Sequence, residues 1–249
     1  MMMVERKVSL VLTTYNSGVN LENTLRSIEN QDYANIEVVI KDGESTDSTL
    51  DIISEYKNNS KYPVVYTSYK DTGIYDAMNQ GYALASGDYI LFFNDTFTKA
   101  DAITTMVSAL ENNTECVGCH SDLVYEKDGH VVRRWKMGEQ KSIYSGWMPG
   151  HPTLLLKREV YEKYGLYKTD YRIAADYEFM VRFLNENRVA YIPETLISMY
   201  YGGTSSNGIG SYFRSFTEGN RALRENGYRL CLGISVLRTV RVLLQFRLM

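Results

Sequence analysis

The sequence lacks a cysteine framework, a long hydrophobic run and an excess of basic charge. Its three cysteines cannot all pair with one another, so a disulfide scaffold is excluded and a reducing compartment is favoured. No stretch of about 18 uncharged apolar residues is present, which excludes a typical membrane-spanning helix. The N-terminal residues form no apolar core that ends in small residues, so we expect no secretory signal and a cytoplasmic protein.

The net charge also limits the function. The chain of 249 residues has a formal net charge of −3, which argues against a nucleic-acid-binding protein because such proteins are usually basic. Hydrophobic residues make up 44% and charged residues 23% of the chain, as in an ordinary globular protein with a sizeable core. The 21 tyrosines suit half-polar clefts as well as cores.

The first 115 residues alternate between strand and helix patterns. We expect strands at 8–12, 37–40, 63–66 and 89–93, and helices at 21–30, 45–56, 71–85 and 99–110. Asn20 and residues 45–47 are candidate N-caps, and Gly87 is expected to end the third helix in a left-handed conformation. This alternation predicts an α/β fold with a mostly parallel central sheet and helices on both faces.

After residue 116 the pattern becomes irregular. We expect a hairpin over 121–133 that turns at Asp128 and Gly129, a loop over 146–153, helices at 159–164 and 175–187, and a strand at 189–192. A Gly- and Ser-rich loop over 200–210 precedes a helix at 211–226. The run CVGCH at 116–120 matches the haem-attachment pattern, but without an export signal we expect a buried strand with both cysteines in the core.

Polar residues follow three of the first four predicted strands. Thr13 and Tyr15 follow the first strand, Asp42 the second, and Asp95 the fourth. Carboxyl ends of parallel strands share one edge, where ligands bind. At this edge Asp42 could accept a nucleobase N–H, Tyr15 could stack on the base, and Asp95 could hold a divalent cation with its phosphate. The alternatives are a turn residue or helix cap for Asp42 and a helix cap for Asp95.

Five blocks of sequence are informative together: VSLVLTTYN, VVIKDGESTDSTLDII, KDTGIYDAMNQGYALASGDYILFFND, GHPT at 150–153 and AADYEFMVRF at 174–183. Together they resemble the family 2 glycosyltransferases, which are inverting nucleotide-sugar enzymes of the GT-A fold. The resemblance covers about residues 5–200. It implies a GT-A domain at 1–210, with a nucleotide-sugar-binding half at 1–115 and an acceptor and catalytic half at 116–210.

The resemblance also implies roles for individual residues. The donor would be bound by Thr13, Tyr15, Asn16, Asp42, Lys70, Asp71, Asp76 and Asn94. A divalent metal, Mn²⁺ or Mg²⁺, would bind at Asp95, and Asp176 would be the catalytic base. The family usually has two acids after the fourth strand, whereas this chain has Asn94 and then Asp95 as the only acid. Asn94 can ligate a hard cation through its carbonyl, but adds no charge.

Asp176 can also be placed from the helical pattern. An apolar stripe begins at Phe179 and Met180, and Asp176 precedes these residues by three and four positions, on the same inward side. Partial burial would raise its pKa toward that of a useful base, while the helix N-terminus opposes this. Glu178 is rotated away and expected to be solvated. The alternative role for Asp176 is a helix cap.

Four further residues are candidates for contact with the acceptor or the diphosphate: His151, Trp147, Asp122 and Arg172. The family often has a histidine near position 151, and the alternative is a loop histidine bonded to the backbone. Trp147 would stack on a sugar or simply pack, and Arg172 would contact phosphate or form a surface ion pair. Asp122 is expected to face the cleft.

The C-terminal stretch, YRLCLGISVLRTVRVLLQFRLM, is apolar, with four arginines and no acid. As a helix within a C-terminal region at 211–249, it would show a basic edge beside an apolar face. That pattern suits peripheral contact with an anionic membrane, here the inner face of the cell membrane. The alternative is a helix packed on the domain or on a second subunit in an oligomer.

The sequence therefore predicts an inverting glycosyltransferase, of the hexosyltransferase type, that moves a sugar from a nucleotide-sugar donor to a glycan or lipid-linked acceptor. The pathway, surface polysaccharide biosynthesis, rests on the resemblance alone. A degenerate sugar-nucleotide-binding scaffold stays open because the acidic motif is reduced. A nucleotidyltransferase would usually need a Gly-rich basic loop after the first strand, and residues 13–16 are TTYN.

Overall fold

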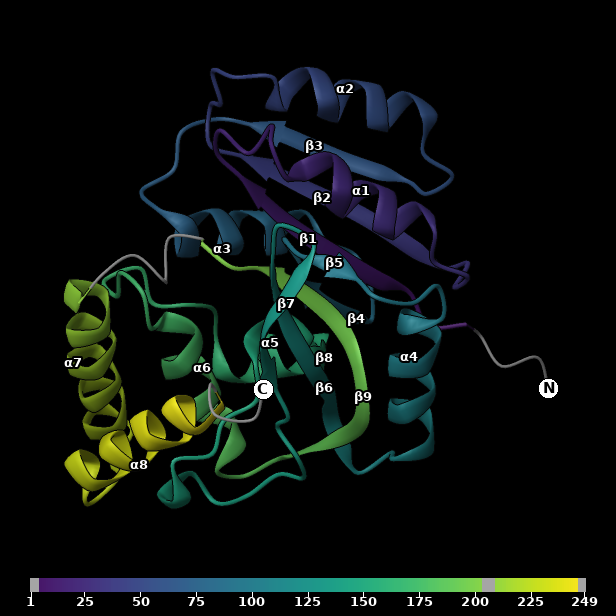
Figure 1. The fold of residues 1–249 in the computed structure, drawn as a ribbon. Coiled ribbons are helices and arrows are strands. Elements are labelled where there is room, and N and C mark those ends of the chain that lie inside the picture. The colour runs from purple at the N-terminus through teal and green to yellow at the C-terminus, as the bar shows by residue number, and fades with distance from the viewer. Residues whose placement is uncertain (1–4, 203–208, 246–249) are drawn as a thin grey trace.

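The computed structural model describes residues 5–202 and 209–245. Within them a nine-stranded sheet has the order β3-β2-β1-β4-β8-β6-β9-β5, and β7 pairs with β6 (Figure 1). The strands are β1 (Val8–Thr14), β2 (Ile36–Asp42), β3 (Val64–Ser68), β4 (Tyr89–Phe92), β5 (Thr96–Phe97), β6 (Cys116–Lys127), β7 (His130–Trp135), β8 (Leu155–Lys157) and β9 (Arg188–Tyr200). The helices are α1 (Leu21–Glu29), α2 (Thr49–Asn59), α3 (Ile74–Leu84), α4 (Ala102–Asn112), α5 (Arg158–Tyr164), α6 (Ala175–Leu184), α7 (Ile209–Glu225) and α8 (Cys231–Leu244).

The predicted α/β fold is confirmed. β3, β2, β1 and β4 pair in parallel, so their carboxyl ends lie at one edge of the sheet. β8 pairs antiparallel with both β4 and β6, and β9 returns parallel to β6. A single sheet thus runs across the expected boundary at residue 115, and the division into donor and acceptor halves stays a prediction.

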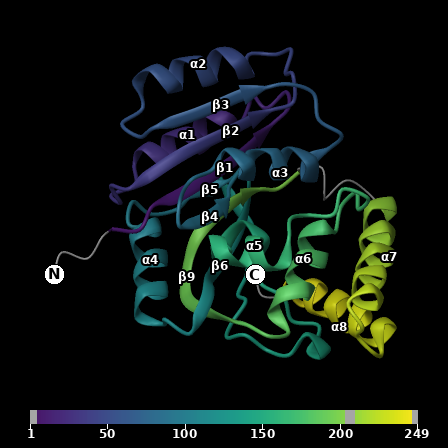
Figure 2. The same cartoon turned by 180° about the vertical axis from the view of Figure 1, so that it is seen from behind.

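Two cores cover the two faces of the sheet. Leu10 and Leu12 of β1 pack with residues of α1, α2 and α4, whereas Val11 between them packs with residues of α3, α5 and α6. This alternation follows from the two-residue period of a strand. Figure 2 shows α3 on the face opposite α1. Helices on both faces are what the sequence predicts.

Two expected caps are wrong. Asn20 precedes α1, but its side chain makes no capping hydrogen bond. Gly87 is absent from the residues with positive φ, so it does not end α3 in a left-handed conformation. It is instead a site of close approach, because a Cβ there would lie 2.7 Å from the Ser9 nitrogen and 2.8 Å from the Lys7 carbonyl oxygen.

The second half keeps the predicted hairpin and extends other elements. β6 and β7 turn at Asp128 and Gly129, with φ of +51° and +76°. Residues 116–120 lie in β6 with both cysteines buried, as expected. The strand expected at 189–192 is longer, and the helix expected at 175–187 ends at Leu184. Most of the loop expected at 200–210 lies outside the described residues.

The C-terminal helices form a layer next to α6 (Figure 1). The helix expected at 211–226 is confirmed as α7, and α8 occupies the middle of the apolar tail. Across the described part of the chain, no helix combines the length and the apolar character needed to cross a bilayer.

Candidate active site

Asp42 joins the ends of three neighbouring strands. Its side chain is fully buried, and its carboxylate accepts hydrogen bonds from the hydroxyls of Thr14 on β1 (2.8 Å) and Ser68 on β3 (2.7 Å). Ser45 adds its N–H at 2.9 Å and its hydroxyl at 2.5 Å. Burial would raise the pKa of Asp42, but these hydrogen bonds outweigh it and lower the pKa.

This arrangement favours the structural alternative for Asp42, a turn residue, and nucleobase recognition by it stays a prediction. Each carboxylate oxygen of Asp42 already accepts two hydrogen bonds from the protein, and no part of the side chain is exposed. A base N–H would have to displace one of these bonds. Asp42 therefore fixes the strand ends and the turn after β2, on which the surface residues of the candidate site are built.

The rim above Asp42 is built by residues on both sides of Gly43. The Tyr15 side chain is 67% exposed, and a Cβ at Gly43 would lie 3.4 Å from its ring and 2.8 Å from the Asp71 carboxylate. Asp71 is held by the buried ammonium of Lys41 at 3.2 Å. Lys41 also donates to the carbonyl of Tyr69 at 2.6 Å. An aromatic ring and an oriented carboxylate thus flank one gap.

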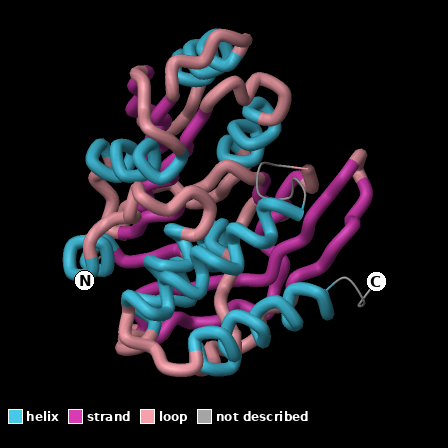
Figure 3. Tube along the Cα trace, turned by 90° about the vertical axis from the view of Figure 1, so that its left-hand side faces the viewer, coloured by secondary structure: helices cyan, strands magenta, loops and turns pink. Residues whose placement is uncertain are grey.

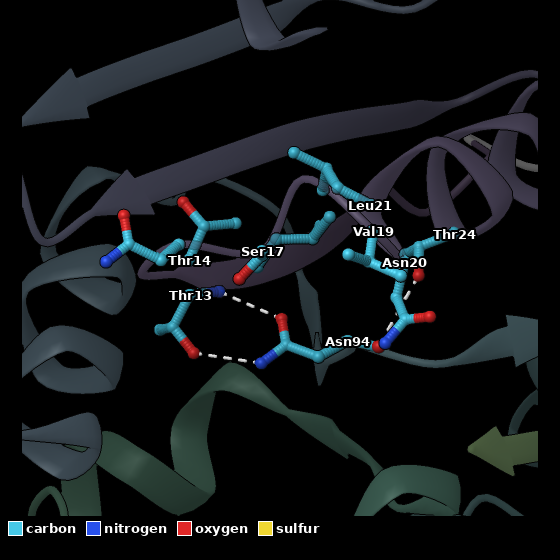
Figure 4. A pocket seen from close by; sticks show the side chains of 10 residues that line it. Thr13, Thr14, Ser17, Val19, Asn20, Leu21, Thr24 and Asn94 are labelled. Carbon is cyan, nitrogen blue, oxygen red and sulfur yellow. Dashed lines mark hydrogen bonds between the residues drawn. The ribbon is translucent and has the colours of Figure 1, made fainter. Parts of the chain in front are cut away.

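The loops after β1 and β4 are joined by an amide pair (Figure 4). Asn94 accepts the N–H of Thr13 and donates to the Thr13 hydroxyl, both at 3.0 Å. Thr13, Asn16 and Asn94 line a pocket of about 250 Å³ there. Asn16 accepts the N–H of Thr46 at 2.9 Å. The side-chain carbonyl of Asn94 thus already accepts one hydrogen bond, and its expected role as a cation ligand stays a prediction.

Lys70 and Asp76 lie on the approach to α3. Lys70 is exposed beside Asp71. Asp76 accepts the N–H and the hydroxyl of Thr72, both at 2.9 Å. The backbone hydrogen bond from Thr72 is the main cause of the lowered pKa of Asp76. Asp76 therefore fixes the turn before α3, and a direct contact with a donor stays a prediction for both residues.

Asp95 is a half-buried carboxylate between β4 and β5. No hydrogen bond or ion pair to it is found within residues 5–202 and 209–245, and burial raises its pKa to about 7. α4 begins at Ala102, so Asp95 is not a helix cap. The same residues contain no group of three or more His, Cys, Asp or Glu side chains suited to a metal. Asp95 thus fits a cation only as a single ionic ligand.

Asp176 lies in the first turn of α6, and its carboxylate accepts a hydrogen bond from the Tyr75 hydroxyl of α3 at 3.2 Å. Burial and the charge of Asp176 raise the pKa of Tyr75, so this phenol stays protonated and donates. Asp176 is half-buried, on the inward side of α6 as expected.

His151 lies in the loop between β7 and β8, with Nε2 at 2.8 Å from the Tyr167 hydroxyl. Burial lowers the pKa of His151, against the charge of Asp176, so the ring is neutral at pH 7. Tyr125 on β6 also has a raised pKa, chiefly through burial; the charge of Arg133 lowers it, and the charges of Asp95 and Asp176 add to the rise.

Glu218 of α7 fixes the entry to α6. Its carboxylate accepts the backbone N–H groups of Arg172, Ile173 and Ala174 at 3.0–3.2 Å. These are the residues just before the helix of Asp176, so α7 sets where the helix begins. The side chain of Arg172 is exposed, and its expected contact with phosphate stays a prediction.

Trp147 and Asp122 do not offer surfaces to an acceptor. Both are buried, with exposed fractions of 3% and 6%. The Trp147 ring N–H donates to the Met137 carbonyl at 2.9 Å, and Asp122 accepts the Met137 N–H at 2.8 Å. The two side chains therefore fix the backbone of Met137, one through its carbonyl and the other through its N–H. The packing alternative for Trp147 applies, and the expectation for Asp122 is wrong.

Glu178 was expected to be solvated and is instead fully buried. Its carboxylate pairs with Arg182 and Lys168, both at 2.9 Å, and accepts from Asn226 at 3.2 Å. The helical pattern misplaced it because α6 is covered by α7 as well as by the sheet.

The sequence reasoning missed Lys41, Tyr75 and Glu218. A lysine within the apolar run VVIKD was a usable signal, since a buried strand admits a charge only with a partner. Tyr75 and Glu218 carry no local signal, because their partners lie 101 and 44–46 positions away in the sequence.

Replacing Asp42 tests its role as a joint between strands. Asparagine cannot accept four hydrogen bonds, so we expect Asp42→Asn to lower the free energy of unfolding by about 2–4 kcal/mol. Urea unfolding measures this, with Asp128→Asn at the exposed hairpin turn as the control. Full stability with selective loss of nucleotide binding would instead support base recognition.

Replacing Asp95 tests the raised pKa. The unfolded carboxyl ionises near 3.8 and the folded one near 7, so stability falls as pH rises through this window. Asp95→Asn removes the penalty, and we expect it to stabilise the protein by roughly 1–3 kcal/mol at about pH 8 and hardly at about pH 4. Unfolding of both proteins at the two pH values, without metal, measures this. An equal effect at both would contradict the assignment.

Comparisons with known proteins identify the family and the fold. The model for glycosyl transferase family 2 matches residues 9–176. A PGL/p-HBAD biosynthesis glycosyltransferase from Mycobacterium tuberculosis is 29% identical over 216 residues, covering 82% of this chain and 81% of the relative. An uncharacterized glycosyltransferase from Haemophilus influenzae is 25% identical over 235 residues, covering 88% and 72%.

Solved structures share the fold. The structure of residues 1–349 of TarS from S. aureus has a TM-score of 0.71 and 18% identity, covering 94% of this chain and 71% of that one. Mannosyltransferase PcManGT from Pyrobaculum calidifontis, in complex with GDP-Man and Mn²⁺, has a TM-score of 0.68 and 17% identity, covering 96% and 72%. The fold is therefore GT-A, and the chain belongs to glycosyl transferase family 2 and is a glycosyltransferase.

Proposed function

We propose that the protein transfers a sugar from a nucleotide-sugar donor to a glycan or lipid-linked acceptor with inversion at the anomeric carbon. The observation that carries the proposal is the hydrogen bond from Tyr75 of α3 to Asp176 at the start of α6, because α3 packs on β1 and β2, whose carboxyl ends form the proposed donor site. Structural neighbours solved with UDP-GlcNAc and with GDP-Man support a nucleotide-sugar donor. The mycobacterial relative, named for PGL/p-HBAD biosynthesis, supports a glycolipid or glycan acceptor.

The donor would lie across the carboxyl ends of β1 and β2. In this position its base stacks on Tyr15, and the gap over Gly43 admits the nucleoside toward Asp71. Lys41 holds the Asp71 carboxylate in place from within the sheet. The diphosphate then points toward Asp95, past the amide pair of Thr13 and Asn94.

Asp176 would act as the general base. Its carboxylate takes the proton of the acceptor hydroxyl as that oxygen attacks the anomeric carbon. The bond to the nucleoside diphosphate breaks on the opposite side, so a single displacement inverts the sugar. Tyr75 holds the carboxylate by a hydrogen bond from the donor side, and Glu218 holds the start of α6 from the other side.

A divalent cation would bind at Asp95 together with the donor diphosphate. When bound, it neutralises charge on the leaving group. The protein contributes one carboxylate, since the described residues hold no group of three or more His, Cys, Asp or Glu side chains suited to a metal. Diphosphate oxygens must therefore complete the coordination shell, and the cation and the nucleotide are expected to bind together.

Replacing Asp176 tests the base. We expect Asp176→Asn to lower kcat by about 10²–10⁴-fold with donor affinity unchanged, because the amide cannot accept the proton. Turnover is measured as nucleoside diphosphate release, and affinity by calorimetry. Asp51→Asn on the outer helix α2 is the matched control. Unchanged turnover in Asp176→Asn would remove this residue as the base.

Metal titration tests Asp95. We expect Mn²⁺ alone to bind weakly and to raise the affinity for UDP or GDP at least about tenfold, more so at pH 8 than at pH 6, because Asp95 must lose its proton. Asp95→Asn should abolish this gain. Calorimetry with each nucleotide, with and without EDTA, measures it. Nucleotide binding without any turnover or metal effect would favour the degenerate scaffold.

A further inference from the structure

Helix α8 exposes its apolar side. Six large side chains along it are 45–63% exposed and form what we call the α8 outer face: Leu232, Val236, Leu237, Val240, Leu243 and Leu244. Figure 3 shows α8, the helix that leads to the C-terminus, along the surface turned to the viewer. Water-soluble helices usually place such residues against the core.

The side of α8 that faces the protein carries one buried apolar residue, Ile234, beside polar residues. Ser235 is buried, and Arg238 donates to the Ser215 carbonyl at 2.9 Å while its guanidinium lies 4.2 Å from the Tyr177 ring centroid. Arg241 donates to the Ser145 carbonyl at 2.9 Å. The basic edge expected from the sequence is thus turned inward, and the orientation of α8 is fixed by specific bonds.

A second copy of the chain is a poor fit to the α8 outer face by size. A helix of this length presents on the order of 200–400 Å², below the roughly 800 Å² that each partner buries in a stable interface.

The charges near this face favour an anionic partner. The sequence from 226 to the end holds no Asp or Glu. Arg229, just before α8, and Arg224, at the end of α7, are exposed. The adjacent acid, Glu225, is paired with Lys168 and Arg221. An apolar strip with cations beside one end matches the boundary between lipid headgroups and acyl chains.

We propose that the α8 outer face docks in the plane of an anionic lipid bilayer. The opposite side of α8 packs through Arg238 on Tyr177, the residue after Asp176. Docking therefore holds α6 near the membrane surface. This surface is separate from the proposed catalytic site, so the inference stands whether or not that site turns over.

Vesicle flotation of the full chain tests the proposal. The double variant Val236→Glu/Val240→Glu places two charges on the outer face and keeps good helix formers, so the fold should persist. We expect the unmodified protein to float with vesicles of phosphatidylcholine and phosphatidylglycerol, and less with phosphatidylcholine alone. The double variant should lose at least about tenfold in partitioning.

Lys57→Glu, on the exposed side of α2, changes the net charge by the same amount and should float like the unmodified protein. Circular dichroism and nucleotide calorimetry confirm that the variants are folded. Absence of flotation by the unmodified protein, or equal flotation by the double variant, would overturn the proposal. So would a dimer in sedimentation that the double variant dissociates, since the face would then bind a second copy.

Discussion

The buried carboxylate of Asp42 is the interaction on which the candidate site depends. It links the last residues of β1 and β3 to the turn that follows β2, through hydroxyls of Thr14, Ser68 and Ser45. These hydrogen bonds join the ends of three neighbouring strands into one structural unit. Tyr15 and Gly43 directly follow Thr14 and Asp42 in the chain, so their positions depend on this hydrogen-bond network.

The catalytic side is held in a comparable way. Asp176 is bonded to Tyr75 of α3, and the segment before it is bonded to Glu218 of α7. The first bond ties α6 to α3, and the second ties it to the C-terminal helices. Residues beyond the family match at 9–176 thus help to position the proposed base.

Local patterns predicted the elements well and their partners poorly. The alternation of strands and helices, the hairpin at Asp128 and the inward side of Asp176 follow from short-range periodicity. The burial of Glu178 and the inward arginines of α8 depend on which surface covers each helix, and periodicity does not specify that surface. Asp42 was assigned to a ligand because its position at a strand end is visible in the sequence, whereas its four hydrogen bonds are not.

Gly43 has no side chain, and this links the rim of the candidate site to the ion pair in the core. Even a methyl group there would press on the Asp71 carboxylate, which is held by the Lys41 ammonium and by the N–H of Gly73 at 3.0 Å. Moving Asp71 would take from the buried Lys41 ammonium its carboxylate partner and leave it the carbonyls of Asp42 and Tyr69. The gap between Tyr15 and Asp71 therefore depends on the absence of a side chain at position 43. A larger residue there would displace Asp71 and so carry an electrostatic penalty in the core.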